Sequence, residues 1–186
     1  MSKNIYVKNP WHSASPGPNA PKIVNAIIEI PAESKAKYEL EKETGLLKLD
    51  RVLYSAVHYP ANYGFIPQSY CDDNDPLDIL VFCTVSVQPM CMMEAKVLGV
   101  MHMLDQGEAD DKIIAVAKGD NALSHFNDIS ELPQHLLDQI QRFFEDYKKL
   151  EKKEVKVGHY ENSEVAQKTV QESLELYKKK FHNKQE

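Results

Sequence analysis

The stretch DDNDPLDILVF, residues 72–82, joins an acidic loop directly to an apolar segment. Four carboxylates lie within residues 72–78, and no basic residue separates them. The apolar run that begins at Ile79 and extends to Val85 is typical of a buried strand. Like charges held against a buried strand raise one another's pKa unless a cation neutralises them, and carboxylate oxygens suit Mg²⁺, Mn²⁺ or Ca²⁺. The stretch therefore predicts a sheet with a metal site at its edge.

An EF-hand does not explain these carboxylates. Counting such a calcium-binding loop from Asp73 puts Asp78 where the motif requires glycine. We therefore expect ligands that different loops bring together.

Short segments with strand character surround the acidic stretch. The turn Lys42-Glu43-Thr44-Gly45 joins two of them as a hairpin. Acidic or proline-bearing loops separate most of the others, which predicts a small, strongly curved antiparallel sheet or barrel. The predicted strands are residues 23–30, 37–41, 46–53, 79–85, 95–103, 112–117 and 155–157.

Helical periodicity appears only late in the chain. Apolar residues recur at 3.6-residue spacing over 136–150, with Pro133 suited to the first turn and Ser130 as a nearby cap. A second helix is predicted to begin near Asn162 or Ser163 and to reach Phe181. Strands followed by helices indicate an α+β fold.

The chain length predicts one compact domain, since 186 residues exceed the usual domain size of about 150 residues only slightly. Four of the ten prolines lie between Pro10 and Pro21, which favours an extended arm rather than a helix. We therefore predict a proline-rich N-terminal arm at residues 1–21 and a single folded domain at residues 22–186.

Composition limits the partners and the location. The net charge is −6, and Arg51 and Arg142 are the only arginines, which argues against bulk attraction to nucleic acid or anionic lipid. The uncharged runs 52–71 and 79–93 contain proline or polar residues or are too short to span a bilayer. The first residues lack the apolar stretch of a signal peptide, and the three cysteines show no CxxC pairing. These features predict a reduced, cytoplasmic protein.

A second acidic cluster, formed by Asp105, Glu108, Asp110 and Asp111, also precedes an apolar strand. Alone, this cluster has an ordinary interpretation as a charged hairpin tip. Two such clusters, each beside a strand, predict one shared edge that binds several ions. Paired metal ions are a standard device for hydrolysing phosphorus esters and anhydrides.

Cationic side chains lie at patterned positions in the first hairpin. Arg51 shares a strand face with leucines, where it is either a ligand clamp or a cap over an ion pair; its planar fork matches phosphate, which favours the clamp. Lys37 and Glu39 share one strand face. Glu29 interrupts an apolar strand and needs a partner, for which an ion pair with Lys37 or Arg51 is the structural alternative.

The remaining sequence features give no specific functional signal. The aromatic segment 58–65 and Tyr147 are more often core than ligand contacts. No GxxxxGK, GxGxxG or GxSxG motif is present, so P-loop, dinucleotide and serine-hydrolase functions lack their signature.

Together these residues resemble the soluble inorganic pyrophosphatases of the first family, in their short bacterial-type form. The segment 73–78 matches the family pattern D-x-D-P-x-D in full. Other family segments follow in order, over roughly residues 14–150 and more weakly to the end: IEIP with Glu29, KYELEK, LDR, YPANYGFIP, the cluster from Asp105 to Lys112, and FFEDYKKLE. Many bacterial members have an acid directly after the residue matching Asp105, where this chain has Gln106.

The resemblance implies hydrolysis of inorganic pyrophosphate to two phosphates by a metal-activated water, which helps to drive biosynthetic reactions that release pyrophosphate. It implies a five-stranded OB-like closed β-barrel with C-terminal helices packed outside, and a homohexamer. It also implies several Mg²⁺ ions per active site, with Mn²⁺ or Zn²⁺ as substitutes, and magnesium pyrophosphate as substrate. The methionines at 90, 92, 93, 101 and 103 gather near one hairpin, as core or as subunit interface.

The resemblance also assigns roles to residues. Asp75 would be the base that receives the proton of the nucleophilic water. Glu29 would reach the metals through water, and Glu39 would lie one layer behind the residues that contact substrate. The metal ligands would be Asp73, Asp78, Asp105 and Asp110. The phosphate oxygens would be held by Lys37, Arg51, Tyr63, Tyr147 and Lys148, with Lys112 and Tyr59 close by.

Two other functions are alternatives to this one. A non-catalytic OB-type module could bind metal or stack single-stranded nucleic acid on its aromatic residues, but the acidic clusters oppose nucleic acid. A Ca²⁺-binding structural domain would not need Lys37, Arg51 and Lys148.

Overall fold

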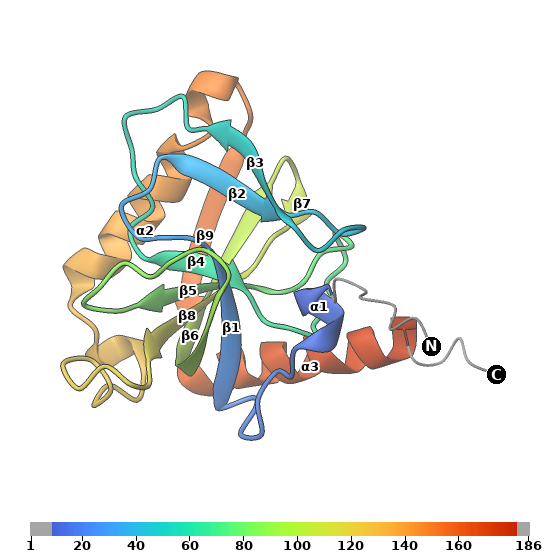
Figure 1. Cartoon of the computed structure of the whole chain (residues 1–186). Helices are drawn as coiled ribbons and strands as arrows, with labels where there is room; N and C mark the ends of the chain where they lie inside the picture. Colours follow the sequence, from blue (N-terminus) through green and yellow to red (C-terminus); the bar gives the residue numbers. More distant parts are fainter. Residues whose placement is uncertain (1–8, 182–186) are drawn as a thin grey trace.

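The computed structural model describes residues 9–181, which form a mixed β-sheet, a separate hairpin and three α-helices (Figure 1). The main sheet contains β1 (Ile23–Ile30), β4 (Asn62–Phe65), β5 (Asp78–Phe82), β6 (Cys91–Asp105), β7 (Glu108–Ala109), β8 (Lys112–Ala117) and β9 (Val155–Glu161). The hairpin is β2 (Ala36–Leu40) with β3 (Leu47–Val52). The helices are α1 (Pro10–Ser13), α2 (Gln134–Asp146) and α3 (Ser163–Phe181), with 3₁₀ turns at η1 (Ile129–Glu131) and η2 (Lys149–Glu151). Within this range the helices are too short or too polar to cross a bilayer.

The strand order of the main sheet is β1-β4-β5-β8-β6, and β6 also pairs with β1. Strands β7 and β9 add to β6. All pairings are antiparallel except that of β5 with β8, so the prediction of a purely antiparallel sheet is wrong at this pair. The long strand β6 lies between β5 and β8 in the sequence, which gives the chain the crossover that parallel neighbours need.

Strand β5 is apolar from Ile79 to Phe82 because both of its faces are covered there. Ile79 and Val81 pack in a core cluster that includes residues of α3, whereas Leu80 and Phe82 pack in a cluster that includes residues of α2. In Figure 1 the two helices lie on different sides of the sheet. A strand buried on both faces reads as an uninterrupted apolar run, as residues 79–82 do.

Strand β4 was not predicted, because its sequence contains glycine and follows proline, both unusual in strands. The structure shows why glycine is needed at position 64. A Cβ atom there would lie 1.8 Å from the Ile27 carbonyl oxygen of β1. Gly64 therefore lets the two strands approach closely enough to pair.

The late helices agree with the predicted periodicity. The predicted cap Ser130 is wrong, because Ser130 lies in η1, and Pro133 takes the cap position of α2 rather than its first turn. Leu150 is 65% exposed, so the apolar stripe of α2 does not extend to it. Helix α3 begins at Ser163 as predicted, and the Asn162 side chain accepts a hydrogen bond from the backbone N–H of Val165.

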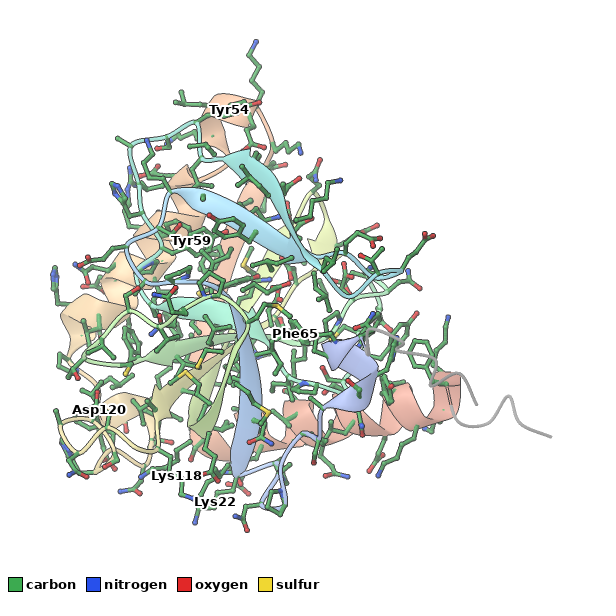
Figure 2. All side chains as sticks on the ribbon, in the orientation of Figure 1. Lys22, Tyr54, Tyr59, Phe65, Lys118 and Asp120 are labelled. Carbon is green, nitrogen blue, oxygen red and sulfur yellow. The ribbon has the colours of Figure 1, made fainter. Side chains whose placement is uncertain are left out.

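The proline-rich segment contains helix α1, so the prediction of an extended arm without a helix is wrong at residues 10–13. Pro10 is compatible with the first turn, and the Asn9 side chain caps it by accepting from the Trp11 N–H. Trp11 is buried, and its indole N–H donates to the Ser69 carbonyl at 2.8 Å. Trp11 packs with Phe65, which Figure 2 labels beside α1. The first eight residues of the predicted arm lie outside the described residues.

Candidate active site

A cavity of about 600 Å³ opens between the hairpin β2–β3, the edge of the main sheet and the end of α2. Carboxylates outnumber lysines in its lining, and four tyrosines lie among them. The lining residues with polar side chains are Glu29, Lys37, Tyr38, Glu39, Lys42, Tyr59, Tyr63, Asp73, Asp75, Asp78, Asp105, Gln106, Glu108, Asp110, Lys112, Tyr147 and Lys148.

The two acidic clusters meet in this cavity, as the sequence predicts. The first cluster lies in the loop that enters β5, and the second flanks the short strand β7. Asp72 is exposed and does not line the cavity, and Asp111 pairs with His102 instead. The shared edge thus selects Asp73, Asp75, Asp78, Asp105, Glu108 and Asp110 from the acids of the two stretches.

A tight hairpin brings the second cluster into place. Asp105 at the end of β6 pairs with Glu108 of β7, and only Gln106 and Gly107 separate them. Both intervening residues have positive φ, at 52° and 93°. Two successive positive φ values are the requirement of a type I′ turn, which glycine satisfies without strain. The turn holds both ends of the hairpin at the cavity.

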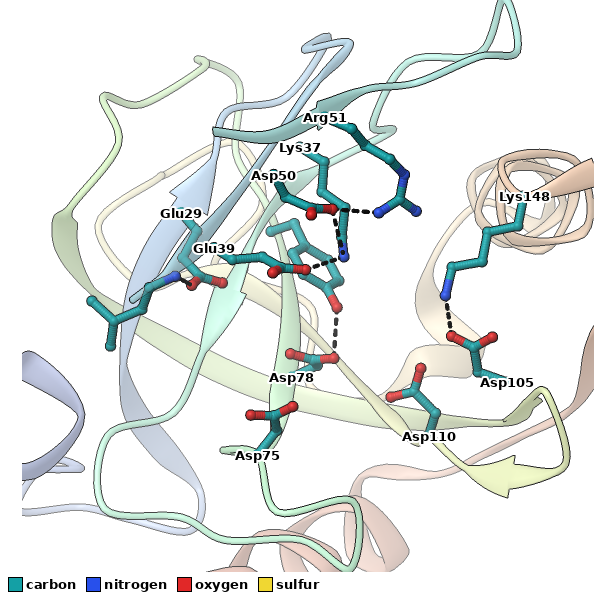
Figure 3. Close-up of polar contacts among 12 residues, drawn as sticks. Glu29, Lys37, Glu39, Asp50, Arg51, Asp75, Asp78, Asp105, Asp110 and Lys148 are labelled. Atoms are coloured by element: carbon teal, nitrogen blue, oxygen red, sulfur yellow. Dashed lines mark hydrogen bonds and ion pairs between the residues drawn. The ribbon is translucent and has the colours of Figure 1, made fainter. Parts of the chain in front are cut away.

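Lys112 neutralises the centre of the acidic edge. The side chain is 2% exposed and contacts both Asp78 and Asp110. The Tyr63 hydroxyl donates to Asp78 at 2.6 Å (Figure 3). Burial raises the pKa of Asp78, Lys112 lowers it, and Asp110 raises it again, with a net increase. The pKa of Asp73 is raised to about 6 by burial and by the neighbouring carboxylates. A further cation would reduce the repulsion among these carboxylates and lower their pKa values.

Lys148 and Lys42 contact carboxylates at either side of this centre. Lys148 contacts Asp105, whose other oxygen, Oδ1, is buried without a hydrogen-bond partner among the described residues (Figure 3). Lys42 contacts Asp75, and its ammonium also lies 5.9 Å from the centre of the Trp11 ring. A buried carboxylate oxygen without a partner marks a position where a cation can bind.

The hairpin β2–β3 places its cations above the acidic edge. Lys37 contacts Glu39 and lies 3.7 Å from Asp50. The Arg51 Nε donates to Glu151 at 2.8 Å, and the guanidinium also contacts Asp50. Arg51 is the only predicted site residue of the described chain that does not line the cavity. Its Nη2 is buried without a partner among residues 9–181, so one donor group of its fork is left unused by these ion pairs.

Glu29 is buried, with 8% exposure, and accepts a hydrogen bond from the Leu40 N–H at 2.6 Å. Burial raises its pKa to about 8, although the Leu40 hydrogen bond opposes the increase. Within residues 9–181 Glu29 forms no ion pair with Lys37 or Arg51, so the alternative of a structural ion pair is not supported.

The three predicted tyrosines serve the core and the cavity together. The rings of Tyr59 and Tyr147 pack on Phe143 with centroid distances of 4.6 and 5.4 Å. Both residues also line the cavity, as does Tyr63. Burial raises the pKa of all three hydroxyls, so each stays protonated as a hydrogen-bond donor near neutral pH.

Sequence reasoning missed Lys42, Trp11 and Tyr38 as cavity residues. Lys42 belongs to the turn between β2 and β3, and its ammonium also lies 3.4 Å from the Asn74 carbonyl oxygen. A charged turn residue is usually solvated, so only the folding of the hairpin over the acidic loop identifies it.

Comparisons with known proteins agree with this site. The model of the inorganic pyrophosphatase family matches residues 26–178. The chain is 52% identical over 177 residues to soluble inorganic pyrophosphatase 1 of Arabidopsis thaliana, covering 95% of this chain and 84% of the relative. It is 54% identical over 173 residues to soluble inorganic pyrophosphatase 2 of Chlamydomonas reinhardtii, covering 93% and 90%.

The structure resembles the crystal structure of inorganic pyrophosphatase from Thermus thermophilus, with a TM-score of 0.89 and 38% identity over 92% of this chain and 99% of that one. The full match to a bacterial chain is consistent with the short form that the sequence resembles. The match to the enzyme of Schistosoma japonicum covers 70% of that chain. The match to the family model, the identity to these relatives and the shared fold show that the chain belongs to the inorganic pyrophosphatase family.

Proposed function

We propose that this protein hydrolyses inorganic pyrophosphate to two phosphates. The observation that carries the proposal is one cavity in which two acidic clusters face lysines and tyrosine hydroxyls. Pyrophosphate is a small polyanion, and an acidic cavity can accept it only together with cations. The names of the relatives support the same substrate.

The residues of the cavity fit Mg²⁺. The buried, unpartnered Oδ1 of Asp105 and the raised pKa of Asp73 both indicate that the carboxylates need more positive charge than the lysines supply. Carboxylate oxygens are the donors that Mg²⁺ prefers. Bound Mg²⁺ would attract the oxygens of pyrophosphate and lower the pKa of water. The proposed ligands are Asp73, Asp78, Asp105 and Asp110, with Glu29 acting through water.

Asp75 is proposed as the base. Its side chain is 48% exposed at the cavity, so water can reach it, and Lys42 contacts it. In this role the Asp75 carboxylate orients an attacking water and takes its proton as the water attacks one phosphorus. Asp73 supports the loop, because its side chain accepts from the Asp75 N–H at 3.0 Å.

The cationic and hydroxyl groups are proposed to hold the phosphate oxygens and to stabilise the charge on the leaving phosphate. Lys148 would exchange its contact with Asp105 for a phosphate oxygen. Glu39 would orient Lys37, which it contacts. The groups assigned to phosphate are Lys37, Arg51, Tyr63, Tyr147 and Lys148, with Lys112 and Tyr59 close by.

We extend the proposal to the assembly and the barrel. The order β1-β4-β5-β8-β6, with β6 pairing again with β1, supports a closed OB-like barrel with helices outside it. We keep the division into a proline-rich arm at residues 1–21 and one domain at residues 22–186 as part of the proposal. Met101 and Met103 are buried, but Met90 and Met92 are exposed, which suits the subunit interface of a homohexamer. We also propose a cytoplasmic location.

Phosphate release from magnesium pyrophosphate, compared with release from ATP and with binding of single-stranded DNA, tests the function. We expect release from pyrophosphate that requires Mg²⁺, with little release from ATP and no DNA binding. Equal rates on ATP would contradict the specificity. DNA binding without phosphate release would favour the non-catalytic module.

A further inference from the structure

Two histidines and a glutamate meet on the outer surface of β6 and β9, away from the active-site cavity. The ligand atoms of His102, His159 and Glu161 all lie within 4.8 Å of one another. The Nε2 of His159 lies 3.0 Å from Glu161 Oε1, and the Nε2 of His102 lies 3.8 Å from the same oxygen. None of the three residues lines the cavity.

The strand pairing produces this cluster. His159 and Glu161 lie two residues apart on β9 and therefore share a face. Tyr160 between them points to the other side, where its hydroxyl donates to the Leu137 carbonyl of α2 at 2.8 Å. The cluster thus lies on the face of β9 turned away from α2.

An irregularity in the ladder brings His102 to the same place. Met101 pairs with Tyr160 and Met103 with Val157, so β9 has one extra residue opposite His102. A Cβ atom at Gly158 would lie 2.9 Å from the His102 carbonyl oxygen. Glycine at this position therefore permits the close approach that sets His102 beside His159, with ring centroids 5.0 Å apart.

Asp111 orients the imidazole of His102. The His102 Nδ1 lies 2.9 Å from Asp111 Oδ2. A carboxylate at Nδ1 favours the tautomer whose proton is on Nδ1, which leaves the Nε2 lone pair directed at Glu161 and His159. Carboxylates support metal-binding histidines in this same way.

We propose that His102, His159 and Glu161 form a second metal site that takes Zn²⁺ or a similar transition-metal ion, with Asp111 positioning His102. Two imidazoles and one carboxylate are a donor set of zinc sites, whereas Mg²⁺ prefers oxygen ligands. At Zn–ligand bonds of about 2.0 Å, tetrahedral ligand atoms are separated by roughly 3.3 Å. The observed 3.0 and 3.8 Å to Glu161 bracket this separation, and the nitrogens of His102 and His159 lie within 4.8 Å of each other, so side-chain rotations could bring all three ligands to one ion.

The site is accessible to an ion. The side chains of His102, His159 and Glu161 are 31%, 71% and 37% exposed. The competing interpretation is that the histidines only form ion pairs with Glu161 and Asp111, without binding metal. The two interpretations differ in whether imidazole nitrogens ligate an added ion.

Pulsed EPR of the full-length protein with one equivalent of Cu²⁺, recorded with excess Mg²⁺, distinguishes them. No histidine lines the active-site cavity in the described chain, so imidazole nitrogen couplings report a site outside it. We expect these couplings in the wild type, and we expect them to disappear in His102→Gln and His159→Gln. The matched control His125→Gln removes an exposed histidine elsewhere and should retain them.

Zn²⁺ calorimetry under the same conditions gives the second measurement. We expect His159→Gln to bind one equivalent less than the wild type, and Asp111→Asn to weaken that equivalent by roughly 10–100-fold. Magnesium-dependent hydrolysis should be unchanged in His159→Gln, which verifies its fold. Nitrogen couplings and zinc stoichiometry that are the same in wild type, His102→Gln and His159→Gln would overturn the site.

Discussion

Every lysine that lines the cavity contacts an acidic side chain. Lys37 contacts Glu39, Lys42 contacts Asp75, and Lys148 contacts Asp105. Lys112 contacts two carboxylates. The lysines therefore neutralise acidic residues of the cavity, and each lies where it could also contact a bound phosphate.

Asp75→Asn tests the proposed role of Asp75 as the base that takes the proton of the attacking water. The amide keeps the shape of the side chain but cannot take a proton, so we expect kcat to fall by roughly 10²–10⁴-fold. The pH dependence of kcat should change as well, while the fold stays intact. Steady-state phosphate release between pH 6 and 9 is the measurement. Asp72→Asn is the matched control, because Asp72 is exposed and outside the cavity. Near-wild-type rates for Asp75→Asn at every pH would contradict the assignment.

Arg51→Lys tests whether the guanidinium binds phosphate or only caps an ion pair. Lysine retains the charge but loses the planar fork, including the unpartnered Nη2. A charge-assisted hydrogen bond contributes about 1.5–3 kcal/mol, so we expect kcat/KM to fall by roughly 10–100-fold.

Glu151→Gln is the control for Arg51, because it weakens the ion pair on the far side of the guanidinium. We expect it to retain most of the activity. Equal losses in Arg51→Lys and Glu151→Gln would show that the ion pair, and not a phosphate contact, is the function of Arg51.

Asp128 links two helical elements, the 3₁₀ turn η1 and the start of α3. Its carboxylate accepts from the N–H groups of Ser130 and Ser163 at 3.0 and 2.9 Å. Partial burial raises its pKa, but these hydrogen bonds outweigh burial and lower it to about 2. Asp128 therefore stabilises the folded state above its ordinary pKa, near 3.8, and the contribution is lost as the pH falls through about 2.

We expect Asp128→Asn to lower the free energy of unfolding by about 1–2 kcal/mol at pH 7, because the amide keeps one acceptor oxygen and one of the two N–H groups loses its partner. The difference from wild type should shrink once the pH falls below about 4. Urea unfolding at fixed protein concentration measures both effects. Glu172→Gln removes an exposed charge from α3 and should change stability little. A difference that stays constant from pH 7 to 3 would contradict the hydrogen-bond explanation.

Strands that depend on local pattern were predictable. The predicted bounds 23–30 and 112–117 are those of β1 and β8, because both strands are apolar runs ended by polar or proline-containing loops. Strand β4 was not predictable in this way. The need for glycine at position 64 comes from the nearby Ile27 carbonyl oxygen of β1, and no local sequence pattern shows this contact. Helix α1 was missed for a similar reason: the prolines favour extended chain, and burial of Trp11 outweighs them.

The candidate site likewise contains residues that the sequence pattern reveals and residues whose role depends on the fold. Acidic clusters beside strands could be recognised from the sequence and do share one cavity. The positions of Lys42 and of the unpartnered Arg51 Nη2 depend on how the hairpin β2–β3 folds over the sheet. Sequence reasoning finds the carboxylates because their density is unusual, and misses lysines that look like ordinary surface residues.

Binding of Mg²⁺ should stabilise the whole protein against unfolding. The cavity gathers carboxylates that repel one another, and an ion bound only by the folded protein stabilises it by about 2.7 kcal/mol at 100 times its Kd. For a chain of this size we expect Tm to rise by roughly 5–11 °C. Calorimetry with MgCl₂, compared with NaCl at equal ionic strength, measures the shift. An equal shift in both salts would mean that general screening, not site binding, is responsible.

Strand β6 has a consequence for how the chain folds during synthesis. It pairs with β1, β7, β8 and β9, and β1 lies about 65 residues before it in the chain. At about 5–20 residues per second, the ribosome takes roughly 4–15 s to pass from residue 30 to residue 105. The hairpin β2–β3 is local and can form early. Strand β1, however, lacks its partner β6 throughout this interval, so we expect the nascent chain to be a substrate for chaperones until β6 emerges.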